Sequence, residues 1–318
     1  MQHYPEGYMP TRRTFVTVLA GTGAALATGA TLARAQSGRK RLIVDAQIHL
    51  WKAESEDWKW VPGMHPQLPE PFTIERALAL MDEAGVERAV VVPPSWPGDR
   101  NDYAIEAAKR HPDRFAVMGR ISLQKPESAE LLPKWREAPG MLGLRLTFLG
   151  GTSKWLEDGT ADWFWPAAEK AGLSVMFLAP GRHAEMARVA ERHPRLSLIV
   201  DHMGMSLSVE AIRTGNFQAT IDDTLSLARY PNVSVKVSGA TNYSKEPYPH
   251  RDINPQIKRV FEAFGPQRCY WGSDLTNGFD KATYRQRIAH FTEALDFLSE
   301  DDKDRVMGRA ILARLGWT

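Results

Sequence analysis

The chain of 318 residues has a single cysteine, Cys269. One thiol cannot form a disulfide within the chain, so an oxidising compartment would add no cross-link to the fold. After residue 35 the sequence also lacks any apolar run near the ~20 residues that cross a bilayer, and it has no repeat, low-complexity tract or linker. These absences favour one soluble domain held together by an apolar core.

The sequence also lacks an excess of charge of either sign. It has 40 basic and 38 acidic residues, of which three arginines and one glutamate precede residue 36. The rest of the chain therefore carries 37 basic and 37 acidic side chains and is neutral. Because nucleic acids and anionic membranes are bound by basic surfaces, the composition excludes both as partners. The expected partner is a small molecule, and the composition leaves homo-oligomer formation open.

The first 35 residues have the layout of an export signal. Arg12 and Arg13 form a twin-arginine pair, an Ala- and Gly-rich apolar run follows over Val16–Leu32, and Ala33-Arg34-Ala35 is a small-x-small cleavage site. An uncleaved membrane anchor is the alternative, but the run is short, weakly apolar and contains three glycines. The sequence predicts export by the twin-arginine pathway, cleavage after residue 35 and a periplasmic mature protein of residues 36–318.

After the signal, short apolar runs alternate with amphipathic stretches of helical period. Eight runs are typical of buried parallel strands, namely Arg41–Leu50, Arg88–Pro93, Phe115–Ile121, Leu142–Phe148, Leu173–Ala179, Leu196–His202, Val233–Ser238 and Cys269–Asp274. Helices are predicted over Ile74–Ala84, Asp102–His111 and Asp162–Ala171, each followed by Gly or Pro. The alternation predicts an α/β fold, a single (β/α)₈ TIM-type barrel, with a doubly wound open sheet as the alternative.

Polar residues stand at or just beyond the carboxyl ends of these predicted strands. They are His49, Ser95, Arg120, Arg145, His202, Lys236, Ser238 and Asp274. In barrels of this type the catalytic groups come from the carboxyl ends of the strands. The set therefore predicts an active site at that end of the barrel.

The first predicted strand carries the segment Asp45-Ala46-Gln47-Ile48-His49-Leu50-Trp51. Residues two apart on a strand point to the same side, so Gln47 and His49 are expected to face the barrel lumen together. The segment resembles the His-x-His motif of the amidohydrolase superfamily, with Gln47 in place of the first histidine. Later strands extend the resemblance with Gly143-Leu144-Arg145, Val200-Asp201-His202-Met203-Gly204, Val235-Lys236-Val237-Ser238-Gly239 and Trp271-Gly272-Ser273-Asp274.

The resemblance covers the mature chain and is to the amidohydrolase-related (amidohydrolase 2) branch, which includes 2-pyrone-4,6-dicarboxylate lactonase and sugar-acid lactonases. It implies a hydrolase of lactone bonds. Metal-dependent members use two first-strand histidines, a histidine that ends strand five and the strand-eight aspartate. Here Gln47 replaces one histidine, and Leu178 stands near the position of another. A catalytic zinc usually keeps three protein ligands, so the sequence favours a metal-independent site without a cofactor, as in 2-pyrone-4,6-dicarboxylate lactonase.

Hydrolysis without a metal needs a general base for the water and partners for the carbonyl oxygen. Asp274 is the candidate base. His49 and His202 are candidates to polarise the carbonyl or to relay the proton. Because no metal acidifies the water, a lactone or activated ester suits this site better than an amide.

Substrate contacts are predicted from the other strand-end residues. Arg145, Arg120 and Lys236 are interpreted as a clamp for an anionic substrate, since these side chains bind carboxylates. The alternative is that they pair with acidic residues on the rim.

Three further residues, Gln47, Trp51 and Ser95, are expected to contact the substrate. For Trp51 the alternative is packing of the loops on the barrel. Strand alternation places Asp201 on the opposite side from His202, which predicts a structural role for Asp201.

Two other functions fit the same residues. A metal-dependent decarboxylase or amidohydrolase would hold zinc with His49, His202 and Asp274. A non-catalytic periplasmic binding protein would account for the missing histidines, but the survival of these three residues together argues against it. Metal analysis and activity after chelation would separate the first alternative from a metal-free hydrolase.

Overall fold

The structure, a computed structural model, describes residues 40–205 and 218–318. The predicted export signal lies outside these residues. Among the residues described, no helix is both long enough and apolar enough to span a membrane. The compact unit from Leu42 to Thr318 contains the predicted site.

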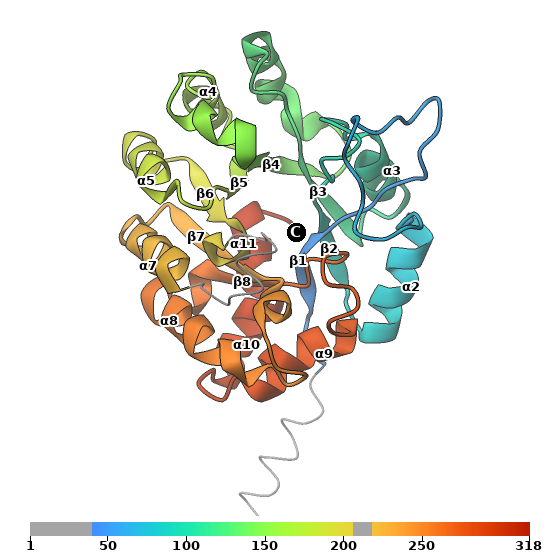
Figure 1. Ribbon diagram of the computed structural model, residues 1–318, viewed down its shortest axis with the longest axis vertical. Helices are drawn as coiled ribbons and strands as arrows, with labels where there is room; N and C mark the ends of the chain where they lie inside the picture. Colours follow the sequence, from blue (N-terminus) through green and yellow to red (C-terminus); the bar gives the residue numbers. More distant parts are fainter. Residues whose placement is uncertain (1–39, 206–217) are drawn as a thin grey trace, which may run out of the picture. The chain divides into compact units, whose positions relative to one another are not determined.

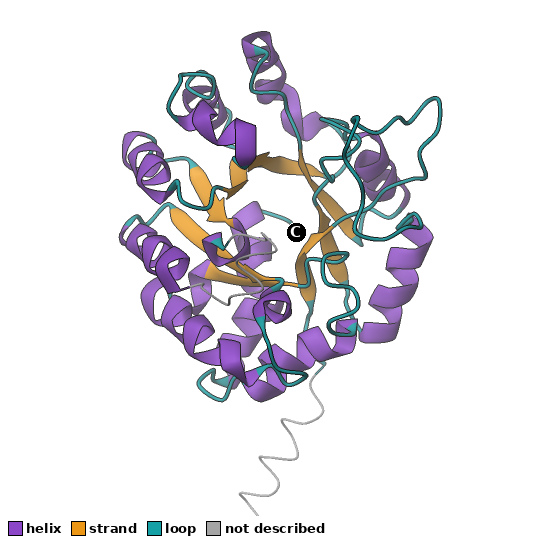
Figure 2. Cartoon of the chain, viewed as in Figure 1, coloured by secondary structure: helices purple, strands orange, loops and turns teal. Residues whose placement is uncertain are grey.

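Eight parallel strands form a ring with helices around it (Figures 1 and 2). The strands are β1 Val44–Ile48, β2 Arg88–Val91, β3 Phe115–Gly119, β4 Met141–Thr147, β5 Ser174–Leu178, β6 Ser197–Val200, β7 Val233–Ser238 and β8 Cys269–Gly272. They pair in chain order from β1 to β8, each parallel to the next. The predicted (β/α)₈ barrel is confirmed.

The barrel closes just beyond the end of β8. The amide of Asp274 donates to the carbonyl of Gln47 at 3.0 Å, and the amide of His49 donates to the carbonyl of Leu275 at 2.7 Å. Ile48 and Leu275 also form an isolated parallel bridge. Main-chain hydrogen bonds therefore fix Asp274, the predicted base, beside Gln47 and His49.

Helices and 3₁₀ or π-helical segments connect the strands, and most of the α-helices lie around the ring (Figure 1). The α-helices are α2 Ile74–Ala84, α3 Asp102–Arg110, α4 Phe164–Lys170, α5 His183–Arg192, α7 Gln218–Ser226, α8 Asn254–Phe264, α9 Tyr284–Ala289, α10 Glu300–Asp304 and α11 Ala310–Leu315. The 3₁₀ segments are η1 Pro126–Glu137, η2 Gly150–Leu156, η3 Asp201–Gly204, η4 Leu227–Arg229, η5 Ala240–Tyr243, η6 Arg251–Ile253 and η7 Pro266–Arg268, and the π-helical ones are η8 His290–Ala294 and η9 Arg305–Arg309.

The helix predicted over Ile74–Ala84 forms with those bounds because both of its ends are capped. The Thr73 hydroxyl accepts from the amide of Arg76 at 3.2 Å. Gly85 follows the last turn with φ 78°, a left-handed conformation that glycine adopts without a steric penalty.

The strand Val233–Ser238 also has its predicted bounds, whereas most other predicted strands are trimmed at their ends. The difference that matters is at β6, which ends at Val200 and not at His202. Beyond it the chain turns into η3, where His202 and Met203 have φ of 53° and 56°. Side-chain alternation along a strand therefore does not extend to Asp201 and His202.

Apolar side chains fill the space inside the barrel. A cluster that includes Val44, Val90, Met118 and Met176 is joined by Ile311 of α11. A larger cluster packs the outer faces of the strands against the helices. The polar residues beyond the strand ends therefore stand on a packed apolar core.

Candidate active site

The structure brings the three predicted catalytic residues together. Oδ1 of Asp274 lies 3.3 Å from Nε2 of His49 and 3.8 Å from Nε2 of His202. All three side chains are buried, and His49 is the most exposed of them at 6%. They come from the end of β1, from η3 and from the segment after β8.

Both ring nitrogens of His49 face oxygen acceptors. Nδ1 lies 2.7 Å from the carbonyl oxygen of Val92, and Nε2 lies 3.3 Å from Oδ1 of Asp274. A carbonyl and a carboxylate can only accept, so both nitrogens must carry hydrogen for these contacts to be favourable. The geometry therefore fits a positively charged His49 paired with an ionised Asp274.

The Gln47 side chain contacts Lys236, Asp274 and His202. The ammonium of Lys236 donates to Oε1 of Gln47, which fixes the orientation of the amide. The Gln47 amide nitrogen then donates to Oδ1 of Asp274 at 3.1 Å and faces Nε2 of His202 at 3.2 Å. Nε2 of His202 is thus the acceptor, and its Nδ1 donates to the Ser238 hydroxyl at 2.9 Å.

Burial and neighbouring groups set the charges of this cluster. Burial lowers the pKa of His202, because the charged imidazolium would lose its hydration, so the ring is neutral near pH 7. Burial alone would raise the pKa of Asp274, but His202 and His49 outweigh it and lower the pKa overall. Asp274 is therefore a carboxylate near neutral pH.

Asp201 belongs to the same buried network. Its Oδ1 lies 2.7 Å from the ammonium of Lys236, and its Oδ2 accepts from Nε of Arg145 at 3.0 Å. Lys236 in turn reaches Gln47, which contacts His202. The prediction that Asp201 and His202 lie on opposite sides was wrong, because β6 has already ended.

Two of the residues predicted to clamp the substrate thus have a carboxylate partner inside the protein. Lys236 has no exposed surface, and its ammonium also donates to Sδ of Met176 at 3.0 Å. Arg145 is 8% exposed and donates to the Thr147 hydroxyl as well as to Asp201. Of the two, only Arg145 has an exposed part.

Arg120 follows β3, and its side chain is 12% exposed. Its Nε lies 3.5 Å from Oδ1 of Asp99, and its Nη1 has no hydrogen-bond partner among the described residues. The side chain of Asn101 holds the main chain of Arg120, accepting from its amide at 2.7 Å and donating to its carbonyl at 2.9 Å. Burial, together with the charge of Arg145, lowers the pKa of Arg120 to about 10, so it remains a cation.

Trp51 and Ser95 differ in their accessibility. Trp51 is fully buried, with its ring 5.8 Å from that of Phe72 and 5.1 Å from that of Trp96. Trp51 therefore packs against aromatic residues of the loops, as in the alternative to a substrate contact. Ser95 is partly exposed and begins a turn, in which its carbonyl accepts from the amide of Gly98 at 3.0 Å.

Asp45 joins the two strands at which the barrel closes. Its Oδ1 accepts from the amides of Gln47 and Ser273, both at 2.9 Å, and its Oδ2 accepts from the hydroxyl of Tyr284 at 2.6 Å. Burial raises the pKa of Asp45 despite these bonds. The side chain therefore fixes the main chain on both sides of the site.

Arg287, which no sequence pattern singles out, is a buried cation that holds the loop carrying Asp274. Its guanidinium donates to the carbonyls of Ser273 at 2.8 Å and Asn277 at 3.2 Å, and to that of Gly278. An arginine in an amphipathic helix is normally solvated, so its sequence position carries no signal of this role.

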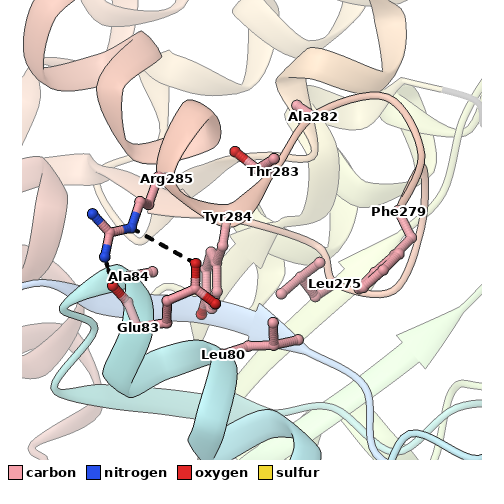
Figure 3. A pocket seen from close by; sticks show the side chains of 9 residues that line it. All are labelled: Leu80, Glu83, Ala84, Leu275, Phe279, Ala282, Thr283, Tyr284 and Arg285. Carbon is pink, nitrogen blue, oxygen red and sulfur yellow. Dashed lines mark hydrogen bonds and ion pairs between the residues drawn. The ribbon is translucent and has the colours of Figure 1, made fainter.

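A separate cavity of about 310 Å³ lies between α2 and the segment that runs from Leu275 into α9 (Figure 3). Leu80, Leu275 and Phe279 give it an apolar lining, and Glu83 and Arg285 form an ion pair beside it at 3.9 Å. None of the predicted site residues lines it. Among residues 40–205 and 218–318, no three His, Cys, Asp or Glu side chains are grouped so as to hold a metal ion.

A sequence model of the amidohydrolase family matches residues 44–313. The chain belongs to the amidohydrolase family. This confirms the resemblance of the strand motifs and makes the protein an enzyme of the hydrolase class. The five segments that carried the resemblance all lie within the match.

Two curated relatives are lactone hydrolases by name. The chain is 27% identical to an L-fucono-1,5-lactonase of Burkholderia ambifaria over 276 residues, which is 83% of this chain and 92% of the relative. It is 27% identical to a 4-sulfomuconolactone hydrolase of Hydrogenophaga intermedia over 235 residues, covering 69% of this chain and 68% of the relative.

Solved structures share the fold. An amidohydrolase from Burkholderia multivorans with bound HEPES has a TM-score of 0.73 at 20% identity over 86% of this chain and 99% of its own, and its zinc-bound crystal form has a TM-score of 0.71. A probable 2-pyrone-4,6-dicarboxylic acid hydrolase from Acinetobacter baumannii with bound citric acid has a TM-score of 0.66 at 19% identity, with the same coverage.

Proposed function

We propose that this protein is a metal-independent hydrolase of a small anionic lactone or activated ester. The observation that carries the proposal is the state of Asp274. One of its carboxylate oxygens is held by His49 and Gln47, and the other, Oδ2, is buried with no hydrogen-bond partner among the described residues. A carboxylate held in this way is placed to take a proton from water.

In the proposed reaction, water attacks the carbonyl carbon of the lactone and passes a proton to Asp274. As Asp274 takes up this proton it loses its charge, and the hydrogen on Nε2 of His49 turns from Oδ1 of Asp274 to the carbonyl oxygen, where negative charge develops. The bond between this carbon and the ring oxygen then breaks. The proton leaves Asp274 for the ring oxygen, directly or through His202, and the product is an open-chain hydroxy or enol acid.

His202 suits proton relay better than carbonyl polarisation. In the resting network its Nε2 already accepts from Gln47, so it offers a lone pair and not a hydrogen. Its lowered pKa keeps that lone pair free of a proton near neutral pH. The weak basicity of Asp274 also favours an activated acyl group, since hydrolysis of an amide would need a stronger general base.

Arg120, just after β3, and Arg145, on β4, favour an acidic substrate. Nη1 of Arg120 is buried and has no hydrogen-bond partner in the part of the chain that the structure describes, and the charge of Arg145 acts on the same guanidinium. A carboxylate or sulfonate between them would supply the missing acceptor and offset their repulsion. Among the relatives, the names 4-sulfomuconolactone hydrolase and 2-pyrone-4,6-dicarboxylic acid hydrolase denote acidic lactones of this kind, whereas L-fucono-1,5-lactone is neutral.

The contacts of Gln47 argue against the metal-dependent alternative. A metal held by His202 would need the atom Nε2, and the amide nitrogen of Gln47 donates toward this atom as well as to Oδ1 of Asp274. The buried ammonium of Lys236 lies on the other end of the same amide, where it would repel a second cation. These residues do not fit a divalent metal, and no step of the proposed reaction uses one.

The proposal is tested with purified protein and a panel of lactones of matched ring size, before and after chelation. We expect turnover of acidic lactones, such as pyrone dicarboxylates and muconolactones, with no loss after chelation. Equal turnover of neutral sugar lactones would contradict the anionic substrate class. Activity that disappears on chelation and returns with zinc would contradict metal independence.

A further inference from the structure

Asn242, in η5, lies beside Asp274 without bonding to it. A Cβ atom on Gly239 would lie 3.1 Å from Oδ2 of Asp274 and 3.2 Å from Nδ2 of Asn242. Both atoms are buried, and neither has a hydrogen-bond partner among the described residues. A carboxylate acceptor and an amide donor thus lie near the bare α-carbon of Gly239 with no hydrogen bond between them, an arrangement that one bridging water would satisfy.

Arg287 decides which way the Asn242 amide points. Its Nη1 donates to Oδ1 of Asn242 at 3.4 Å, and a guanidinium can only donate, so the oxygen must face Arg287. The amide nitrogen is left facing Gly239 and Asp274. A Cβ on Gly278 would collide with Oδ1 of Asn242, so the oxygen is also enclosed by the loop after β8.

Glycine at position 239 keeps this space open. The residue has φ 62°, and its amide donates to the carbonyl of Gly272 at 3.1 Å where β7 and β8 end. The left-handed conformation favours glycine on backbone grounds alone. Its lack of a side chain has a second effect here, because a methyl group would press on Asp274 and Asn242 together.

We propose that Asn242 holds the attacking water against Asp274. This inference rests on the proposed function and adds a residue to its machinery. The water donates one hydrogen to Oδ2 of Asp274 and accepts from Nδ2 of Asn242. Its second lone pair is left for the carbonyl carbon, and as that bond forms the donated proton passes to Asp274. Asn242 is thus a catalytic residue through its contact with the reacting water.

The first test compares Gly239→Ala with Gly172→Ala. Gly172 has a similar φ of 64°, but a Cβ there would meet nothing within 4 Å. Both variants carry the same backbone penalty, and only Gly239→Ala fills the space between Asp274 and Asn242. We expect Gly239→Ala to lower kcat by about 100-fold or more, whereas Gly172→Ala keeps the activity of the wild type.

The second test replaces the amide itself. Asn242→Leu, which keeps the size of the side chain, should lower kcat about 100-fold and leave KM for the lactone little changed. Asn242→Asp places a second carboxylate beside Asp274, so like-charge repulsion should move the acidic limb of the kcat profile to higher pH. A residue with only a packing role would not move that limb.

A crystal structure of the wild type gives a readout that does not need activity. We expect an ordered water between Oδ2 of Asp274 and Nδ2 of Asn242, and its loss in Gly239→Ala. An unchanged kcat in both Asn242→Leu and Gly239→Ala, or a direct bond between Asn242 and Asp274, would overturn the inference. A wild type without lactone hydrolysis would instead contradict the proposed function, and the ordered water would still be open to test.

Discussion

Asp274 combines two features that ordinary aspartates lack. Its backbone is left-handed, with φ 59°, and within residues 40–205 and 218–318 its buried carboxylate is hydrogen-bonded through one oxygen only. Left-handed backbones are uncommon outside glycine and tend to occur where function fixes a side chain. Arg287 and the bond from the Asp274 amide to Gln47 hold this conformation in place.

Asp274→Asn keeps the size of the side chain and removes its capacity to take a proton. We expect kcat for an acidic lactone to fall by about 100- to 10,000-fold. The control is Asp82→Asn, which changes a carboxylate that is 65% exposed and pairs with Arg114. Full turnover in Asp274→Asn, measured against this control, would show that another group is the base.

Arg120→Gln tests the recognition of the anion. A hydrogen bond to a charged group is worth about 1.5–3 kcal/mol, so KM for an acidic lactone should rise about 10- to 100-fold while kcat changes little. A neutral lactone should show no such rise. Arg100→Gln, at a position whose side chain is 40% exposed, is the control. An equal KM effect on both substrates would argue against a charge contact.

At the scale of elements, η3 depends on two neighbouring helices. The Thr224 hydroxyl, from α7, donates to the carbonyl of Met203 at 2.9 Å and lies 2.9 Å from Nε2 of His183 at the start of α5. A Cβ on Gly204 would collide with both side chains. The left-handed turn that carries His202 is therefore braced from outside the barrel.

Thr224→Val removes this brace and keeps the shape of the side chain. The carbonyl of Met203 and Nε2 of His183 would lose a buried partner, which costs about 1–3 kcal/mol in the free energy of unfolding. We expect kcat to fall as well, since His202 is less firmly placed. Thr292→Val is the matched control, because the Thr292 hydroxyl also donates to a helix carbonyl, that of Ile288. Identical losses of stability and activity in the two variants would contradict a specific brace.

The π-helical segment η8 makes stability dependent on pH. Burial, with a smaller effect of His250, lowers the pKa of His290 to about 4. The Nε2 of His290 contacts Oδ1 of Asn254 at 2.7 Å, and its Nδ1 is buried without a partner among the described residues. The ring is thus neutral in the folded state, while in the unfolded chain it takes up a proton below about pH 6.5.

As pH falls from about 6.5 to about 4, the unfolded state binds this proton and the folded state does not, so stability is lost by about 3 kcal/mol in that window. His290→Asn should reduce the loss, measured as the free energy of urea unfolding at pH 7 and at pH 4.5. His193→Asn, at a partly exposed histidine paired with Glu169, is the control. The same loss in His290→Asn and the wild type would contradict the assignment.

At the scale of the whole molecule, we propose that residues 1–35 direct export by the twin-arginine pathway. Replacing Arg12 and Arg13 by lysine should keep the precursor in the cytoplasm, because the pathway reads the arginine pair and not its charge. Cell fractionation and mass spectrometry of the N-terminus provide the measurement, with Arg39→Lys as the control. We expect the exported protein to begin at Gln36, and a mature chain that retains residues 1–35 would contradict cleavage.

The sequence by itself determined the barrel and three residues that meet in the candidate site. Alternation of apolar runs with helical stretches is local, and Ile74–Ala84 and Val233–Ser238 show how well it sets an element when caps or burial agree. His49, His202 and Asp274 followed from their places at strand ends, because parallel strands in a barrel bring those ends together.

Only the tertiary structure decided which charged groups surround His49, His202 and Asp274. Lys236 pairs with Asp201, 35 positions away in the sequence, and Arg287 reaches the loop of Asp274 from a helix. Beyond the end of a strand, side chains no longer alternate between its two faces, and the left-handed backbone of His202 is an example. The partners of buried charges are therefore set by contacts between distant segments, and local sequence patterns do not encode them.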